Sequence, residues 1–184
     1  MKKILLLILA VVLLTGFAVA QNSNWVTIKQ AASAQNSTKL YVIDFYTSWC
    51  GWCKKMDAET FSHATVKKIL DKYYIAVKFD AEGQDEFTWK GQTFAGNPAR
   101  NGRKVPHQFA YSVLGQKMGY PTTAIFAADK SLMTVLPGYY SADDYSRILW
   151  YFASGDYSKY SWEQYEKIFD KEIRPVMNKQ LGIK

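Results

Sequence analysis

The stretch that decides the fold spans residues 40–56 and reads LYVIDFYTSWCGWCKKM. Its first seven residues are rich in β-branched and aromatic side chains, which is typical of a buried strand. Thr47 and Ser48 then lead to two cysteines, Cys50 and Cys53. A helix is expected to start at these cysteines and to continue to about Phe61. The segment therefore predicts a strand that runs directly into a helix with a Cys-x-x-Cys pair at its start.

This cysteine pair is expected to be redox-active. A bridge across so short a loop constrains the unfolded chain little, so a structural staple explains it poorly. Free backbone N–H groups and the helix dipole stabilise a thiolate at a helix start. They can lower a thiol pKa from about 8.5 to roughly 3.5–7.5, and Lys54 and Lys55 add positive charge. We expect Cys50 to be the exposed nucleophile and Cys53 the shielded thiol that resolves a mixed disulfide.

The sequence resembles the thioredoxin family over roughly residues 25–153. Asp44, six residues before Cys50, matches the family's buried acid, and the resemblance implies that it carries a proton to or from Cys53. Burial in an apolar strand raises a carboxyl pKa, as that role requires near neutral pH. Lys78 falls where the family often has a lysine close to this acid, which implies support for the same proton transfer.

The same resemblance implies a substrate-binding surface. The sequence GYPT at residues 119–122 is similar to the family's cis-proline loop, so Tyr120 and Pro121 are expected to hold an extended substrate peptide. Trp49, Gly51 and Trp52 flank the cysteines and are expected to contact substrate, although the tryptophans could also simply shield the dithiol.

Two departures from the family pattern concern the cysteine helix. The residues between the cysteines are neither the Gly-Pro of cytosolic thioredoxins nor the Pro-His of strongly oxidising relatives, which leaves the redox potential open. Ala58 stands where thioredoxin has a helix-kinking proline. The closest resemblance is to exported thioredoxin-like proteins and to the soluble domains of thiol–disulfide interchange proteins.

The remaining elements alternate in a way that predicts an α/β fold, a thioredoxin-like mixed β-sheet flanked by helices on both faces. Strands are expected at 40–46, 73–79, 122–126 and 132–136, and helices at 25–36, 50–61, 62–72, 106–114, 141–152 and 162–174. Ser62 or Thr65 is expected to cap the third helix, Pro106 to start the fourth, and Pro175 to end or kink the last. Residues 21–184 then form one domain, with an insertion at 82–105 before the cis-proline region and a C-terminal helical extension at 154–184.

The insertion is expected to begin on the dithiol side, because parallel strands of a βαβ unit end at the same sheet edge. A hairpin is predicted around Lys90-Gly91, and turns at Asn97-Pro98 and Asn101-Gly102. One hypothesis makes residues 84–105 a wall or lid that selects substrates through the side chains of Phe87, Trp89, Arg100 and Arg103. The alternative is a surface elaboration packed on its own aromatic residues.

The N-terminus has the layout of a secretory signal peptide. Lys2 and Lys3 precede an apolar run of eleven residues, and small residues end at Ala20. Cleavage near Ala20 would place the mature protein in the periplasm or outside the cell; an uncleaved anchor is the alternative. Without residues 1–20 the net charge falls from +7 to +5, and no basic stripe suggests nucleic acid.

These observations predict an exported thiol–disulfide oxidoreductase, more a reductase or isomerase than a strong oxidase. Its partners would be protein thiols and disulfides, with a membrane thiol–disulfide relay as electron donor. No cofactor and no metal are expected, and the oligomeric state is open. One rival is a binding module that holds partners without turnover. The other is a metallochaperone that uses Cys50, Cys53 and Met56 for a soft ion, although a methionine at that helical position is more often core.

Overall fold

The computed structural model describes residues 25–116 and 118–183. The expected signal peptide, residues 1–20, lies outside this part of the chain, so its cleavage stays a prediction. Across the described residues, no helix is both long enough and apolar enough to span a membrane.

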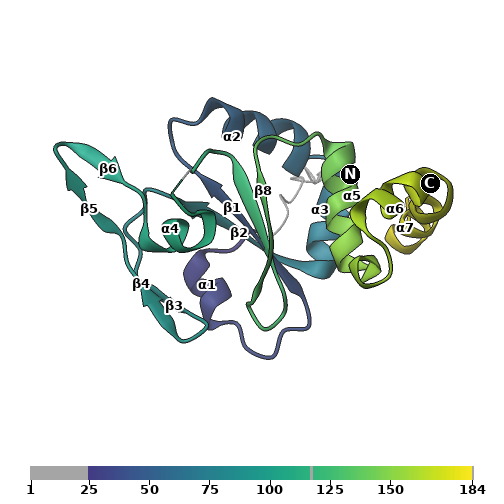
Figure 1. The fold of residues 1–184 in the computed structure, drawn as a ribbon, viewed down its shortest axis with the longest axis horizontal. Helices are drawn as coiled ribbons and strands as arrows, with labels where there is room; N and C mark the ends of the chain where they lie inside the picture. The colour runs from purple at the N-terminus through teal and green to yellow at the C-terminus, as the bar shows by residue number, and fades with distance from the viewer. Residues whose placement is uncertain (1–24, 117, 184) are drawn as a thin grey trace, which may run out of the picture.

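A four-stranded mixed sheet lies at the centre of the molecule (Figure 1). Its strands, in spatial order, are β2 (Tyr74–Asp80), β1 (Leu40–Tyr46), β7 (Thr122–Phe126) and β8 (Leu132–Pro137). β1 runs parallel to β2 and antiparallel to β7, and β8 runs antiparallel to β7. The mixed sheet is confirmed, and each strand lies within one residue of its expected bounds.

Helices cover both faces of this sheet (Figure 1). One face packs against α1 (Ile28–Ser33) and α4 (Gln108–Leu114), and the other against α3 (Ala64–Tyr73) and α5 (Ala142–Ala153). Because successive side chains of a strand point to opposite faces, β1 supplies alternate residues to two separate apolar cores. The central strand is therefore buried on both sides, as its sequence predicts.

The cysteine helix begins where β1 ends. α2 (Gly51–Met56) continues without a break into a π-helical turn, Asp57–Phe61. Ala58, at the position of the helix-kinking proline in thioredoxins, lies inside this turn. A π turn distorts a helix much as a proline does, so the distortion is present at this position without a proline.

Histidine side chains begin two of the helices, contrary to the prediction. The Nδ1 atom of His63 accepts a hydrogen bond from the backbone amide of Thr65 at 3.3 Å, so neither Ser62 nor Thr65 is the N-cap of α3. His107 caps α4 in the same way at 3.0 Å, which leaves Pro106 outside the helix. At both helix starts an imidazole nitrogen serves as the acceptor that a Ser or Asp side chain usually provides.

The first helix is shorter than predicted and leaves Trp25 outside it. Thr27 caps α1 in a capping box with Gln30. The ring of Trp25 instead packs edge-on against Phe61, with 4.9 Å between ring centroids. The apolar residues whose spacing suggested a longer helix are therefore buried separately: Trp25 packs against Phe61, and the others belong to α1.

The insertion forms two hairpins. Their strands are β3 (Phe87–Trp89), β4 (Gln92–Phe94), β5 (Asn97–Arg100) and β6 (Arg103–Val105). The predicted turns at Lys90-Gly91 and Asn101-Gly102 are confirmed, and both residues of each turn have positive φ, as type I′ hairpins require. The turn expected at Asn97-Pro98 is wrong, because these residues begin β5.

The two hairpins differ in burial. Phe87 is 6% and Trp89 is 4% exposed, and both pack against Phe109 of α4. For this first hairpin the burial favours the alternative hypothesis, an elaboration packed on aromatic residues, over substrate contact by Phe87 and Trp89. Arg100 and Arg103 are exposed on the second hairpin, which projects from the body of the molecule (Figure 1).

The C-terminal extension closes the core between α3 and α5. It consists of α6 (Trp162–Ile168), a π-helical turn (Phe169–Ile173) and α7 (Arg174–Leu181). The predicted capping box at Ser161 is confirmed. Pro175 lies in the first turn of α7, where proline is tolerated, and the predicted break in the helix is present as the π-helical turn directly before it. The extension adds four buried side chains to this core, those of Tyr165, Phe169, Met177 and Leu181.

Candidate functional site

Cys50 and Cys53 form a disulfide at the start of α2, with an S–S distance of 2.16 Å. Cys50 is the N-cap, and the backbone amide of Cys53 donates to the Cys50 Sγ at 3.0 Å. The Cys53 amide, which has no backbone acceptor within the helix, thus donates its hydrogen bond to this sulfur. After reduction the same contact would favour a thiolate on Cys50.

Both cysteines are buried in this disulfide form. Cys50 is 4% exposed and Cys53 is 3% exposed. The expectation of an exposed Cys50 is therefore wrong for the oxidised state, because the bond ties its sulfur to that of Cys53 within the first helical turn.

Two tryptophans next to the cysteines in sequence each pack against a tyrosine, and we call these four side chains the aromatic collar: Trp49, Trp52, Tyr120 and Tyr139. Trp49 is 65% and Trp52 is 58% exposed. Trp49 packs edge-on against Tyr120 at 6.1 Å between ring centroids, and Trp52 packs against Tyr139 at 5.7 Å. Tyr139, just before α5, belongs to this surface and also packs against the core of α3 and α5. The collar provides exposed apolar area of the kind that binds a partner.

Charged groups hold the collar in place. The Trp49 Nε1–H donates to both carboxylate oxygens of Glu82, each at 3.1 Å. The Nζ of Lys55 lies 5.1 Å from the ring centroid of Trp52 and 5.3 Å from that of Tyr139. Glu82 was not among the predicted site residues, although its position gives a signal: it follows β2, and the parallel strands β1 and β2 end at the same edge of the sheet.

The cis-proline loop lies beside the collar. The Tyr120–Pro121 peptide bond is cis, and Pro121 is buried directly before β7. Since the first residue of β7 pairs with Phe45 near the end of β1, this loop meets the edge of the sheet from which the chain leads to Cys50. Burial, and next the charge of Glu82, raise the pKa of Tyr120 to about 12.

Asp44 lies buried on β1, on the sheet face that packs against Met56 of α2. It is 1% exposed. Lys78, its register partner on β2, donates to Oδ2 of Asp44 at 2.7 Å and also pairs with Asp57, the residue after α2. Burial raises the pKa of Asp44 to about 6; Lys78 opposes this rise and the charge of Asp57 adds to it. The structure therefore provides a carboxyl group that can gain or lose a proton near neutral pH.

The remaining predicted contact residues lie around this site. Gly51 is exposed at the first position of α2, with open space where a Cβ would stand. The second hairpin of the insertion approaches the collar through Lys104, whose Nζ is 4.0 Å from Glu82. The role of Arg100 and Arg103 in a wall beside the dithiol stays a prediction.

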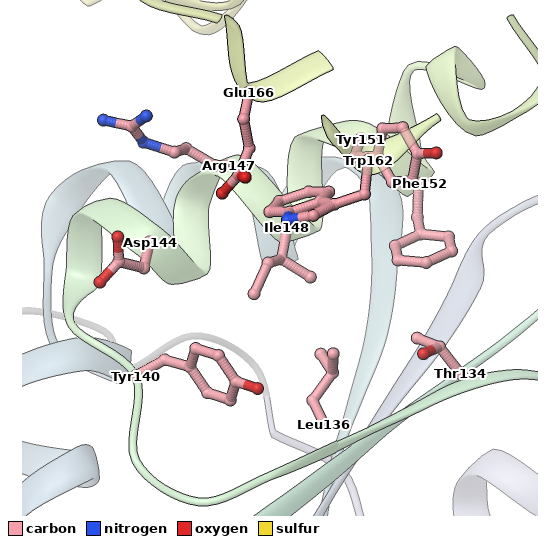
Figure 2. A pocket seen from close by; sticks show the side chains of 10 residues that line it. All are labelled: Thr134, Leu136, Tyr140, Asp144, Arg147, Ile148, Tyr151, Phe152, Trp162 and Glu166. Carbon is pink, nitrogen blue, oxygen red and sulfur yellow. The ribbon is translucent and has the colours of Figure 1, made fainter. Parts of the chain in front are cut away.

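A separate cavity of about 430 Å³ lies between β8, α5 and α6 (Figure 2). Leu136, Ile148 and Trp162 contribute apolar surface to it from these three elements (Figure 2). None of the residues predicted for the site lines it. The cavity is therefore distinct from the disulfide and its collar.

The soft-metal alternative needs ligands beyond the two thiols. In the part of the chain that the structure describes, no group of three His, Cys, Asp or Glu side chains could hold a metal ion. Met56 is fully buried and packs in the core with α3 and α5. Its thioether is a core contact in this structure.

Comparisons with known proteins concern the same region. A family model described as a thioredoxin-like domain matches residues 28–153. Thioredoxin-1 of Drosophila melanogaster is 40% identical over 53 residues, which are 27% of this chain and 44% of that protein. The chain thus spans less than half the length of this curated relative.

Two solved structures are similar in fold. A thioredoxin-fold protein from Helicobacter pylori has a TM-score of 0.53 at 11% identity, covering 79% of this chain and 83% of that one. A thioredoxin from Thermus thermophilus has a TM-score of 0.50 at 16% identity, covering 70% of this chain and 85% of that one. At such identities the likeness shows the fold alone.

Proposed function

This chain belongs to the thioredoxin-like domain family, and we propose that it is a thiol–disulfide oxidoreductase acting on protein thiols and disulfides. The observation that carries the proposal is the Cys50–Cys53 disulfide at the N-terminus of α2. The exposed collar beside it gives a polypeptide substrate a surface to contact, and Asp44 supplies a carboxyl group that titrates near neutral pH.

In the reduced protein, the Cys50 thiolate attacks one sulfur of a substrate disulfide. A bond forms between Cys50 and the substrate, and the other substrate sulfur leaves as a thiolate. Cys53 then transfers its proton to Asp44 and attacks Cys50. The Cys50–Cys53 bond closes, and the second substrate sulfur is released. Two electrons have passed to the substrate, and a dithiol donor must return two electrons to the pair before the next cycle.

We further propose that the protein works as a reductase or isomerase rather than as a strong oxidase. The dipeptide between the cysteines lacks the Pro-His of strong oxidants. The proposal also includes export after cleavage near Ala20 and a membrane thiol–disulfide relay as the electron donor. Export is supported by the signal-peptide layout of residues 1–20.

The first test is the reduction potential of the pair, measured by equilibration with thiol buffers. A value near about −270 mV favours a reductase, one near about −120 mV an oxidant, and one between them an isomerase. A pair that cannot be cycled would overturn the enzyme proposal and favour a binding module.

The second test is a trapping experiment with Cys53→Ser and, as its matched control, Cys50→Ser. Incubation with a protein that carries accessible disulfides is expected to accumulate a mixed disulfide on Cys50 in the first variant only. Mass spectrometry of the adduct identifies the bond. Trapping by Cys50→Ser alone would show that Cys53 is the attacking residue, equal trapping by both variants would show that either thiol can attack, and binding without any trapping would favour the binding module.

A further inference from the structure

The cavity between β8, α5 and α6 joins the thioredoxin-like domain to the C-terminal extension. The family model matches residues 28–153, whereas α6 begins at Trp162. The cavity volume of about 430 Å³ lies within the roughly 300–1,000 Å³ that small-molecule sites usually have. Because α6 supplies one wall, this cavity needs the extension in order to form.

The spacing of the lining residues explains why they meet. Ile148 and Phe152 of α5 are four positions apart, as are Trp162 and Glu166 of α6, so each pair lies on one face of its helix. Leu136 of β8 completes the wall from the sheet. Three elements therefore present chosen side chains to one space.

Apolar and aromatic side chains form much of this wall. Ile148 is buried, and Leu136 and Phe152 are half-buried. The rings of Tyr140, Phe152 and Trp162 stand at three sides of the cavity (Figure 2). Such a lining favours a ligand with an apolar group, which leaves water when it binds. The faces of aromatic rings also attract a cation.

The charged groups at the cavity leave a negative charge available. Glu166 makes no ion pair or side-chain hydrogen bond with any residue that the structure describes. Arg147 also lines the cavity, but its guanidinium group is paired with Asp143 at 2.8 Å and Asp170 at 3.4 Å and points away from the cavity (Figure 2). Asp144 adds a second, exposed carboxylate. The site thus favours a cation, although the whole chain has a net charge of +7.

The position for that cation is between Glu166 and Trp162. Residues four apart on a helix have Cβ atoms about 5–6 Å from each other, so one ammonium group can contact both the carboxylate and the ring. On the other side of the cavity, the hydroxyl of Tyr140 points into the same space (Figure 2). It has no hydrogen-bond partner in the described part of the chain.

We propose that this cavity binds a small organic cation, an ammonium ion that carries an aromatic or aliphatic group. The ammonium group lies between the Glu166 carboxylate and the Trp162 ring, and the apolar group packs on Leu136, Ile148 and Phe152. A carboxylate ligand would instead be repelled by Glu166. The inference goes beyond the proposed function and does not depend on it, because the cavity is separate from the disulfide.

The test titrates the oxidised protein with 2-phenylethylamine and follows the amide signals by two-dimensional NMR. At pH 7 this amine is positively charged, as a lysine side chain is. Two ligands of similar shape are the controls: neutral 2-phenylethanol and anionic 3-phenylpropionate. The amine is expected to shift signals of β8, α5 and α6 saturably and to bind about tenfold more tightly than the alcohol, because the ion pair and the ring each favour the cation.

Substitutions on α6 then locate the cation. Glu166→Gln is expected to weaken amine binding about fivefold and to leave alcohol binding unchanged. Its matched control is Glu163→Gln, which removes the same charge from the same helix. Glu163 pairs with Lys167 and does not line the cavity, so this variant is expected to keep the amine affinity. Trp162→Leu is expected to weaken binding of the amine more than binding of the alcohol.

Several results would overturn the inference. These are no saturable binding of the amine, equal affinities for amine and alcohol, or tighter binding of 3-phenylpropionate. Shifts confined to the aromatic collar would do so too, as would an equal loss of amine affinity in Glu163→Gln and Glu166→Gln. If Trp162→Leu fails to fold, Glu166→Gln decides, because its exposed side chain has no partner to lose among the described residues. Failure of the proposed function would appear in disulfide exchange and would leave these titrations unaffected.

Discussion

Replacing Asp44 with asparagine is expected to stabilise the oxidised protein at neutral pH. The carboxyl is 1% exposed, and its pKa rises from an ordinary value of 3.8 to about 6, chiefly because of burial. One unit of pKa corresponds to about 1.4 kcal/mol, so ionising the buried group costs about 3 kcal/mol of folding free energy. Asparagine resembles the protonated carboxyl in shape and carries no charge to bury.

The sign of the pH dependence follows from proton binding. Between about pH 4 and pH 6, the folded protein holds a proton on Asp44 that the unfolded chain has released. Stability from this group is therefore highest below pH 4 and is lost as the pH rises through about 6. The asparagine variant has no carboxyl at this position, so it does not lose stability in this way as the pH rises. It should match the unmodified protein near pH 4 and exceed its unfolding free energy by about 3 kcal/mol near pH 8.

Urea titrations of both oxidised proteins at pH 4 and pH 8 measure this difference directly. Asp57→Asn is the matched control, because Asp57 is an exposed partner of the same Lys78. It should cost up to about 1 kcal/mol near pH 8, as exposed ion pairs do, which is the opposite sign. The reasoning would be refuted by an Asp44→Asn variant that is no more stable at pH 8 than the unmodified protein, or that is equally stabilised at both pH values.

Three further substitutions and one truncation test the packing and the helix cap. Trp89→Ala is expected to lower the unfolding free energy by about 3–5 kcal/mol, and Arg103→Ala to change it by less than about 0.5 kcal/mol; equal losses in urea titrations would contradict the different burial of the two hairpins. A chain that ends at Ala153 is expected to lose its cooperative thermal transition in circular dichroism, because residues 154–184 supply four buried core side chains; a sharp transition would count against this. Ser161→Ala is expected to cost about 1 kcal/mol in the same urea assay, and no loss would argue against the capping box.

Local patterns predicted most elements well. The run of apolar residues in β1 and the capping box at Ser161 each involve residues within a few positions of one another, so the sequence contains the whole signal. The exceptions involve contacts between distant residues. The aromatic residues of the first hairpin look available for substrate in sequence, yet Phe87 and Trp89 pack on Phe109 of another element.

Residue type alone also could not predict the structural role of a side chain that can serve in several. His107 serves as a helix cap, and its ring packs 5.5 Å from that of Phe87. Tyr139 precedes α5 and packs against the core, and it also contacts Trp52 beside the disulfide. The roles of His107 and Tyr139 could not be predicted without knowing which helices and strands contact one another in the fold.

The sequence by itself determined the redox centre and the fold class, because a strand, a Cys-x-x-Cys pair and a helix start are encoded within residues 40–56. Only the tertiary structure decided the properties of Asp44. Its pKa depends on burial beneath helices and on Lys78, which lies 34 positions away. Burial and charge act through space, so their effect on one carboxyl is set by which distant segments the fold brings together.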